Sequence, residues 1–399
     1  MATGHITTKD IEDMCEVAVL SPGVCAGMGT ANTMHIMAEA LGMTLPGSAP
    51  VAASGQRMRD FAREAGRRVV SLVNENLRPR DIMTPAAFSN AMAVGLAVSG
   101  SINMLRHLQA VASEGEIDAN VYDLIHQLGQ KVPLLCAIKP NGSGRIDELE
   151  ASGGARAVMK QLESLLHRDV MTVTGRTVGE NLADVTVGDG VIGSLDQPVR
   201  SGPSVVILRG SLAPQGSIMK LGTGKAAAFR GQCRVFESQE DAMAALARRE
   251  IKGGEVIVLR GLGARGGPGV ASASWFVAAV NGAHLGEEIA VITDGQLSGL
   301  NRGFTIGQVM PEAADGGPIA LVRDGDTVAI NVEARTIDIE LSESELEHRR
   351  AAMPAFVPNE KAGWLAIYQD RVQPLTQGGT LKPGARMDQS ATAQKQKSP

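Results

Sequence analysis

The hydrophobic pattern of the chain changes near residue 173, and this change constrains the fold more than any other feature. Before it, apolar residues recur at three- and four-residue spacing, which is typical of amphipathic helices. After it, short apolar runs alternate with glycine- and proline-containing loops, which is typical of strands. We therefore expect an α/β protein with an α/β domain over residues 1–175 and a β-rich domain, a closed barrel or a sandwich, over 176–376. The polar tail 377–399 is predicted to be disordered.

The first domain is predicted to be mostly helical. Apolar residues share one face in the segments 31–41, 57–74, 86–96 and 99–113. Gly42 follows the first of these as a C-terminal cap. The continuous apolar run 132–138 is expected to form a buried strand.

The second domain is predicted to contain short strands separated by turns. They cover residues 204–208, 255–259, 288–292, 319–322, 327–332 and 336–341. The pair Asp324-Gly325 is a hairpin signal between two of these strands. Helices are expected again at 343–352 and near Trp364.

Composition excludes several classes of protein. A formal net charge of −5 gives no basic surface for nucleic acid. No apolar run approaches the roughly 20 residues of a membrane-spanning helix, and residues 1–9 do not read as a signal peptide. The four cysteines are scattered without a Cys-x-x-Cys pair, which argues against a disulfide framework and for a reducing cytoplasm. His35 and His107 have no histidine partner at zinc-binding spacing.

The segment 21–34 is the first candidate for chemistry, because it places Cys25 in a glycine-rich loop that runs into a helix. Glycines here let the backbone approach a ligand, and Thr30 or Asn32 could cap the helix. The positive N-terminal end of that helix suits a bound anion or a thiolate. The alternative is a buried structural cysteine in a tight turn, since free cysteine is commonly buried.

The second candidate is the segment 293–299, which follows a predicted strand and contains Asp294 and Ser298. A serine between glycine-containing turns is exposed and movable, as a base or nucleophile must be; the alternative is a simple β-turn. The loop 263–269 could hold a phosphate or carboxylate through its backbone N–H groups, but it lacks the ending of a nucleotide-binding P-loop. The loop 210–216 is similar and weaker.

Read in order, these stretches resemble the dihydroxy-acid and phosphogluconate dehydratase family over residues 9–376. The matching motifs lie at 22–34, 40–49, 78–83, 173–181, 266–269, 293–299 and 316–325. The resemblance implies an N-terminal α/β domain followed by a β-barrel, usually in homodimers. It also implies dehydration of a 2,3-dihydroxy acid to a 2-keto acid with an iron–sulfur cluster and Mg²⁺.

The resemblance assigns roles to particular residues. Cys25 would be a cluster ligand and Ser298 the base that takes the C2 proton. Thr30, Asn32 and Asp294 are the substrate-binding candidates. The substrate would be a branched dihydroxy acid or a sugar acid, and the residue pattern of the 22–34 motif favours the branched dihydroxy acid.

The chain also departs from the family pattern. Ser272 stands where the family has a magnesium-binding glutamate, and Gln296-Leu297 replaces a common Arg-Phe pair. The family's further cluster cysteines, a magnesium-binding aspartate and a carboxylated lysine belong to a segment that would lie before Met1. Cys15 is the alternative cluster ligand.

Three hypotheses follow from these departures. The chain is a dehydratase-like hydro-lyase, a degenerate paralogue that acts as a binding or interaction subunit, or the product of a truncated gene.

Overall fold

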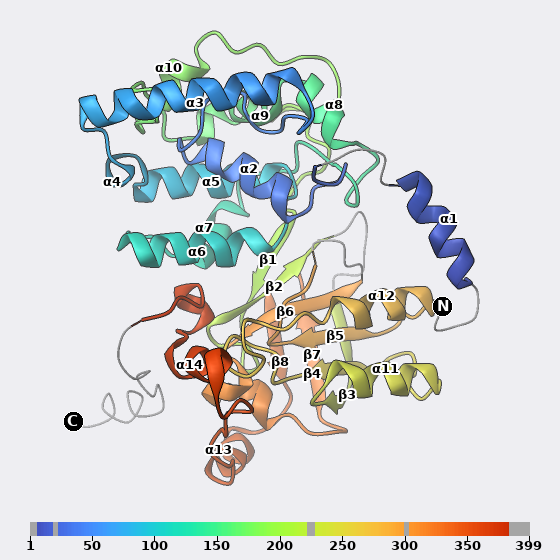
Figure 1. The fold of residues 1–399 in the computed structure, drawn as a ribbon. Coiled ribbons are helices and arrows are strands. Elements are labelled where there is room, and N and C mark those ends of the chain that lie inside the picture. Colours follow the sequence, from blue (N-terminus) through green and yellow to red (C-terminus); the bar gives the residue numbers. More distant parts are fainter. Residues whose placement is uncertain (1–5, 19–22, 222–227, 299–302, 383–399) are drawn as a thin grey trace, which may run out of the picture. The chain divides into compact units, whose positions relative to one another are not determined.

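The computed structural model describes residues 6–18, 23–221, 228–298 and 303–382. The chain divides into two compact units between Val205 and Val206 (Figure 1). This division lies beyond the domain boundary expected at residues 175–176, because the intervening segment returns to the first unit. Arg200 and Leu134 form a bridge, and the Ser204 hydroxyl donates to the carbonyl of Leu96 at 2.8 Å.

The first unit is helical in its described residues. Its helices are α1 (Thr8–Ala18), α2 (Thr30–Ala40), α3 (Gln56–Glu75), α4 (Pro79–Ile82), α5 (Pro85–Ala97), α6 (Asn103–Gly115), α7 (Val121–Leu128), α8 (Ile146–Ala151), α9 (Gly154–Gln161) and α10 (Val178–Leu182). Helix α5 is the centre of the core, since most of its residues are buried around its whole circumference. It packs against α2, α7 and α9.

The predicted helices are confirmed as α2, α3, α5 and α6, with α6 beginning four residues later than expected. Gly42 adopts a φ of +80° directly after α2, as a C-terminal glycine should. The predicted strand at 132–138 is wrong. This extended segment is buried, but the N–H groups of Leu135 and Cys136 donate to the carbonyl of Ala97 at the end of α5 instead of to a strand.

The second unit is an eight-stranded, mixed and nearly closed barrel. The strands are β1 (Val205–Leu208), β2 (Gly216–Lys220), β3 (Ala228–Phe236), β4 (Val256–Leu259), β5 (Ala290–Thr293), β6 (Phe304–Met310), β7 (Thr327–Asn331) and β8 (Thr336–Ile339). Their order is β1-β2-β6-β5-β4-β3-β7-β8. Strands β3 to β6 are parallel, whereas β2, β7 and β8 join them antiparallel. A parallel bridge between Arg209 and Thr336 joins the two ends of the sheet.

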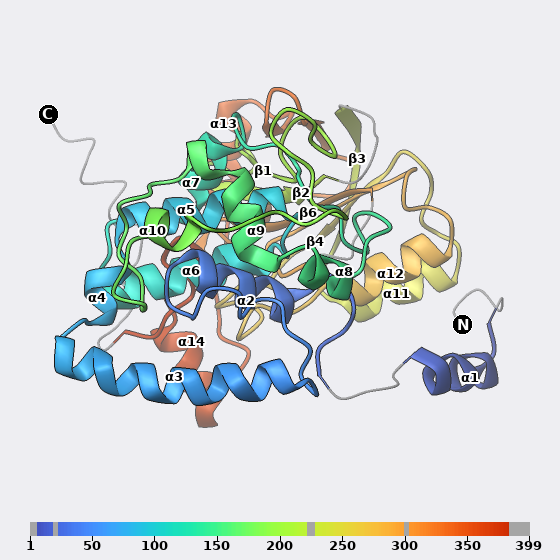
Figure 2. The same ribbon diagram turned by 90° about the horizontal axis from the view of Figure 1, so that it is seen from above.

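Alternating residues fill the barrel, because successive side chains of a strand point to opposite faces. The interior positions include Val206, Leu208, Val256, Val258, Ala290, Ile292, Phe304 and Ile306. Helices α11 (Gln239–Ala247) and α12 (Ser274–Gly282) lie side by side outside the sheet (Figures 1 and 2). The amide of Phe276 in α12 donates to the Gln239 side chain of α11. Helices α13 (Glu343–Ala351) and α14 (Gly363–Arg371) follow β8.

The barrel expectation is therefore confirmed, although the strand assignments are only partly right. The predicted strand at 319–322 is wrong, because Pro318–Leu321 is a 3-10 helix. The carbonyl of Ala320 in this helix and that of Val322 directly after it accept from the Arg260 guanidinium. The turn at Asp324-Gly325 consequently leads into β7 without completing a hairpin; β7 instead pairs with β8.

Strands β2, β3 and β6 were not expected. In β3 the alternation is weak because arginine, glycine and glutamine interrupt it, and β6 contains Gly307 and Gln308. Of the predicted disordered tail, residues 378–382 contact the barrel unit. Thr380 is buried, and its carbonyl accepts from the amide of Gln373. The remainder of that tail, from 383 on, lies outside the described residues.

Candidate functional site

The loop before α2 holds Cys25 at the surface of the first unit. Cys25 is exposed, so the alternative of a buried structural cysteine is wrong. The buried Asn32 side chain donates from Nδ2 to the carbonyls of Cys25 at 2.9 Å and Gly27 at 2.8 Å. The amide of Met28 donates to the carbonyl of Lys139 at 2.8 Å. The backbone around the thiol is thus fixed from both sides.

This arrangement corrects the expected capping role of Asn32. The N-cap position of α2 is Gly29, which has no side-chain capping bond, and Asn32 turns back to the loop. Gly27 is required by close packing, since a Cβ there would lie 2.9 Å from the Lys139 carbonyl oxygen. Such a contact is too short for a real side chain, so alanine would displace one of the two segments.

The first residues of α2 and α6 meet beside this loop. Thr30 Oγ1 accepts from Asn103 Nδ2 at 2.6 Å and lies 3.4 Å from the Ser101 hydroxyl. The amide of Ser101 donates to Thr33 Oγ1 at 2.9 Å. Two helix N-termini therefore point at one half-buried polar cluster. Their partial positive charges suit a carboxylate.

We expect Asn32→Ala to loosen the Cys25 loop, because two carbonyls lose their donor. The cost is about 1–2 kcal/mol for two side-chain hydrogen bonds of ordinary strength. Hydrogen exchange should accelerate at the amides of residues 25–29. The matched control is Asn141→Ala, whose side chain makes a single long bond of 3.4 Å to Ser99. Unchanged exchange in the Asn32 variant would contradict this role.

The second candidate loop begins with Asp294, which has no exposed surface and follows β5. Its carboxylate accepts from the amides of Gly261 at 3.1 Å, Leu262 at 2.9 Å and Ala313 at 2.9 Å. Burial raises the pKa of this carboxyl, while the three N–H bonds oppose the rise. Asp294 thereby joins the loops that follow β4 and β6, and its oxygens face the chain's own backbone.

Glu312 plays a similar part after β6. Its carboxylate accepts from the amides of Arg265 and Gly266, both at 2.9 Å. Burial, followed by the negative charge of Asp315, raises its pKa to about 7. A Cβ on Gly263 would collide with this carboxylate. The loop 263–269 therefore does cradle a carboxylate, as its sequence suggested, but the carboxylate belongs to the chain itself.

Ser298 lies next to the N-terminus of α12. Its amide donates to Ser274 Oγ at 2.7 Å, and Ser272 pairs with Gln296 in a parallel bridge. The Gln296 side chain is held in turn by Gln308, whose Nε2 donates to Oε1 at 2.7 Å. Ser298 is half-buried and Ser272 is exposed. The last residue of the predicted motif, Gly299, lies outside the described residues.

The described residues do not fit an iron–sulfur cluster or a magnesium site. They contain no group of three or more histidine, cysteine, aspartate or glutamate side chains arranged to hold a metal. Burial raises the thiol pKa of Cys136 and of Cys233 to about 12, which makes both poor ligands. Cys15 is exposed on α1. A cluster needs several thiolates, whereas the α2 loop supplies Cys25.

Sequence reasoning missed Asn103, Ser274 and Glu312. A Ser-Gly-Ser stretch before α6 was visible, but nothing local indicated that Asn103 would meet Thr30. Glu312 could not be found from spacing, because its partners lie 46 and 47 residues earlier in the chain.

A membrane-spanning segment is also not found, since the helices within the described ranges are too short or too polar to cross a bilayer.

Comparisons with known proteins extend this picture. Two family models match, "Dihydroxy-acid/6-phosphogluconate dehydratase N-terminal" at residues 1–181 and the corresponding C-terminal model at 190–379. The dihydroxy-acid dehydratase of Caldicellulosiruptor bescii is 40% identical over 386 residues, covering 96% of this chain and 70% of the relative. That of Leifsonia xyli subsp. xyli is 41% identical over 381 residues, with coverages of 94% and 67%. That of Methylococcus capsulatus is 43% identical over 389 residues, with coverages of 96% and 69%.

Proposed function

The chain belongs to the dihydroxy-acid/6-phosphogluconate dehydratase family of hydro-lyases, and from this premise we propose that it dehydrates a 2,3-dihydroxy acid. The proposed reaction removes the C2 proton to a base and the 3-hydroxyl as water, which leaves an enol that becomes the 2-keto acid. Ser298 is the proposed base. Thr30, at the paired N-termini of α2 and α6, is the proposed contact for the substrate carboxylate.

The observation that carries this proposal is the support around Ser298. Its amide is held by Ser274 Oγ, and the preceding Gln296 pairs with residues 271–273 through two backbone hydrogen bonds of 2.9 Å. The buried Asp294 carboxylate, which accepts hydrogen bonds from three backbone amides, anchors the start of the same loop. We propose positioning roles for Asp294 and Ser274, and the same for Asn32 at the Cys25 loop.

A serine hydroxyl becomes an effective base only when a neighbouring group lowers its pKa. In the family that help comes with cofactors, and the described residues of this chain do not form their ligand sets. We therefore expect the chain to act together with ligands from outside the described residues. Those ligands would complete the site that the Cys25 loop begins.

The test begins with the purified 399-residue chain, reconstituted anaerobically with iron, sulfide and Mg²⁺. We expect a colourless protein without 2-keto acid production from branched dihydroxy acids or sugar acids. The Caldicellulosiruptor bescii relative, treated identically, is the positive control. Brown colour and turnover by this chain alone would contradict the proposed need for outside ligands.

The complementary test is co-expression with the part of the Caldicellulosiruptor bescii relative that the alignment leaves unmatched. We expect turnover to appear and to fall at least about 100-fold in Ser298→Ala, the scale of a lost general base. Cys25→Ser should remove the brown colour. Turnover that survives Ser298→Ala would refute the assignment of the base. Failure of co-expression to yield any turnover would favour the second hypothesis, a binding or interaction subunit.

A further inference from the structure

The Thr30 hydroxyl at the start of α2 is surrounded by groups that can donate to it. Asn103 Nδ2, at the start of α6, donates to Thr30 Oγ1 at 2.6 Å, which is short for a hydrogen bond from an amide. The Ser101 hydroxyl lies 3.4 Å from the same oxygen. Thr30 and Asn103 are half-buried, whereas Ser101 is only 1% exposed. These three side chains decide which way the Thr30 proton points.

The directions of these hydrogen bonds follow from the number of protons. A threonine or serine hydroxyl has one proton and two lone pairs. Ser101 Oγ accepts from the amide of Asn103 at 3.4 Å, and its own proton needs an acceptor because the side chain is buried. In the described part of the chain, the acceptor within its reach is Thr30 Oγ1. Both lone pairs of Thr30 are therefore occupied, so its proton points to solvent or to a bound molecule.

Close packing holds the two helix starts in this arrangement. The amide of Ser101 donates to the buried Thr33 Oγ1 at 2.9 Å. A Cβ on Gly100 would lie 2.9 Å from Thr33 Cγ2, so glycine is needed for this approach. The Thr30 hydroxyl is thus held as a donor before any ligand arrives, which lowers the cost of ordering it on binding.

We infer that Asn103 is a positioning residue for the proposed dehydration, because its amide group holds Thr30 as a hydrogen-bond donor to the substrate carboxylate. An ionised carboxylate only accepts hydrogen bonds, so a hydroxyl that is obliged to donate suits it. Asn103 acts through Thr30. This inference rests on the proposed function, which assigns the carboxylate to Thr30, and adds the group that sets the polarity of that contact.

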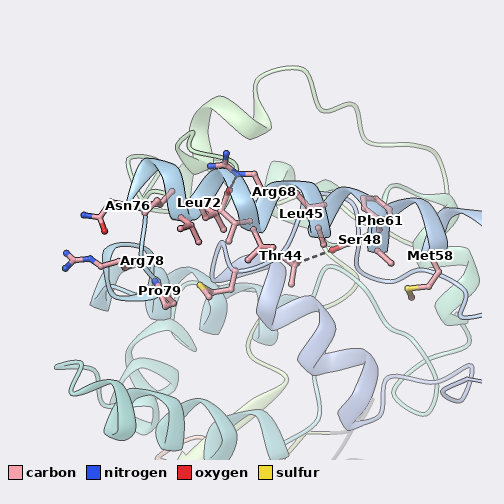
Figure 3. A pocket seen from close by; sticks show the side chains of 17 residues that line it. Thr44, Leu45, Ser48, Met58, Phe61, Arg68, Leu72, Asn76, Arg78 and Pro79 are labelled. Atoms are coloured by element: carbon pink, nitrogen blue, oxygen red, sulfur yellow. Dashed lines mark hydrogen bonds between the residues drawn. The ribbon is translucent and has the colours of Figure 1, made fainter.

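The apolar groove beneath α3 is an alternative place for an acid on the first unit. It has a volume of about 770 Å³, and apolar side chains of α3 and of the segment facing it line most of its wall (Figure 3). Arg68 and Arg78 border it, and they are already paired with Glu75 and Asp81 respectively. Because the lining is apolar and these two charges are already neutralised, the groove suits a small polar acid less well than Thr30 does.

Binding of 2-hydroxy-3-methylbutanoate to the full chain tests the inference without requiring turnover. This acid keeps the carboxylate and 2-hydroxyl of a branched dihydroxy acid but has no 3-hydroxyl to lose. Chemical-shift titration of the ¹⁵N-labelled chain at pH 7 measures its dissociation constant, and the largest shifts should lie at the amides of residues 30–33 and 101–104. Asn103→Ala should raise the dissociation constant about 5-fold, which corresponds to one hydrogen bond of ordinary strength.

Asn103→Asp separates positioning from structure. The carboxylate keeps the shape of the side chain but accepts the Thr30 proton instead of donating to Thr30. A negative charge in the first turn of α6 should leave stability unchanged or raise it, because it faces the positive end of the helix. We nevertheless expect binding to weaken at least about 10-fold, more than in Asn103→Ala, since the proton is captured and the two carboxylates repel one another.

The matched control is Asn120→Asp, which adds the same charge beyond the other end of α6. The Asn120 side-chain oxygen caps α7 by accepting from the amides of Tyr122 and Asp123, and an aspartate can do the same. We expect its dissociation constant for the acid to equal that of the unmodified chain.

The possible results separate this inference from the proposed function. Asn103 variants that bind as tightly as the unmodified chain, or an Asn103→Asp variant that binds more tightly than Asn103→Ala, would overturn the inference alone. An unmodified chain that does not bind the acid, or that shifts at the α3 groove instead, would overturn it together with the Thr30 contact. The assignment of Ser298 as the base would still be decided by turnover in the co-expressed complex.

Discussion

Asp294→Asn is expected to destabilise the barrel unit by about 3 kcal/mol at neutral pH, the scale of leaving buried donors unpaired. The carboxylate accepts from three backbone amides, two at one oxygen and one at the other. An amide side chain of the same shape has a single acceptor oxygen, and its NH₂ group would face at least one N–H donor. A donor then opposes a donor in a site with no exposed surface.

Denaturant unfolding monitored by circular dichroism measures this loss. Peptide-level hydrogen exchange locates it, and protection should fall at Gly261, Leu262 and Ala313 while the first unit keeps its pattern. The matched control is Asp338→Asn, because Asp338 is half-buried and accepts from the amide of Ser211 at 2.8 Å. A variant at 294 that is no less stable than the control would refute the anchoring role.

The second large effect is a loss of stability as the pH rises from about 4.5 to 7. Burial raises the pKa of Glu312 in the barrel unit, and that of Glu39 in the first unit, from 4.5 to about 7. Glu39 is enclosed beside the amides of Gly47 and Ala49, both of which donate to it at 2.8 Å. Because each folded pKa lies above the unfolded value, the folded state binds more protons in this interval.

The sign follows directly from this proton balance. The contribution of each group is fully present below pH 4.5 and is lost as the pH rises through about 7. Its size is about 3 kcal/mol per group, from 1.36 kcal/mol for each pKa unit. Glu39 and Glu312 should therefore each lower the free energy of unfolding of their unit as the pH rises from acidic to neutral. Because other titrating groups also contribute, these two contributions are isolated with matched variants.

Glu312→Gln and Glu39→Gln isolate the two contributions. Each should flatten the pH dependence of the unfolding free energy, relative to the unmodified chain, by about 3 kcal/mol between pH 4.5 and 7.5. The control is Glu340→Gln, because the exposed Glu340 is paired with Arg230 and its pKa is lowered. Its contribution has the opposite sign and is lost as the pH falls. Parallel curves for Glu312→Gln and the unmodified chain would contradict the burial effect.

Local pattern predicted the helices α2, α3 and α5 to within two residues at each end, since their periodicity and caps are encoded in neighbouring residues. It predicted the strands whose apolar runs are uninterrupted, such as β4 and β5. It failed at 132–138, where an apolar run is buried against the end of α5 rather than paired in a sheet. Burial and strand pairing produce the same local signal, so the sequence could not separate them.

The residues of the candidate site were also predicted only in part. Cys25, Thr30 and Ser298 could be named because they lie in, or directly after, loops with distinctive glycine spacing. The internal roles of Asn32 and Asp294 could not, because both side chains bond to backbone groups whose approach depends on the folded path. The contacts of Asp294 with Gly261 and Ala313 span 33 and 19 residues.

By itself, the sequence determined the family, the two-part architecture and the loops at which chemistry is concentrated, because motifs and hydrophobic period are local properties. The tertiary structure decided which groups those loops present. It exposed Cys25, filled the 263–269 cradle with Glu312 and buried Asp294. These outcomes depend on distances between residues far apart in the chain. Only the packed backbone fixes such distances, and with them the exposure and charge of each group.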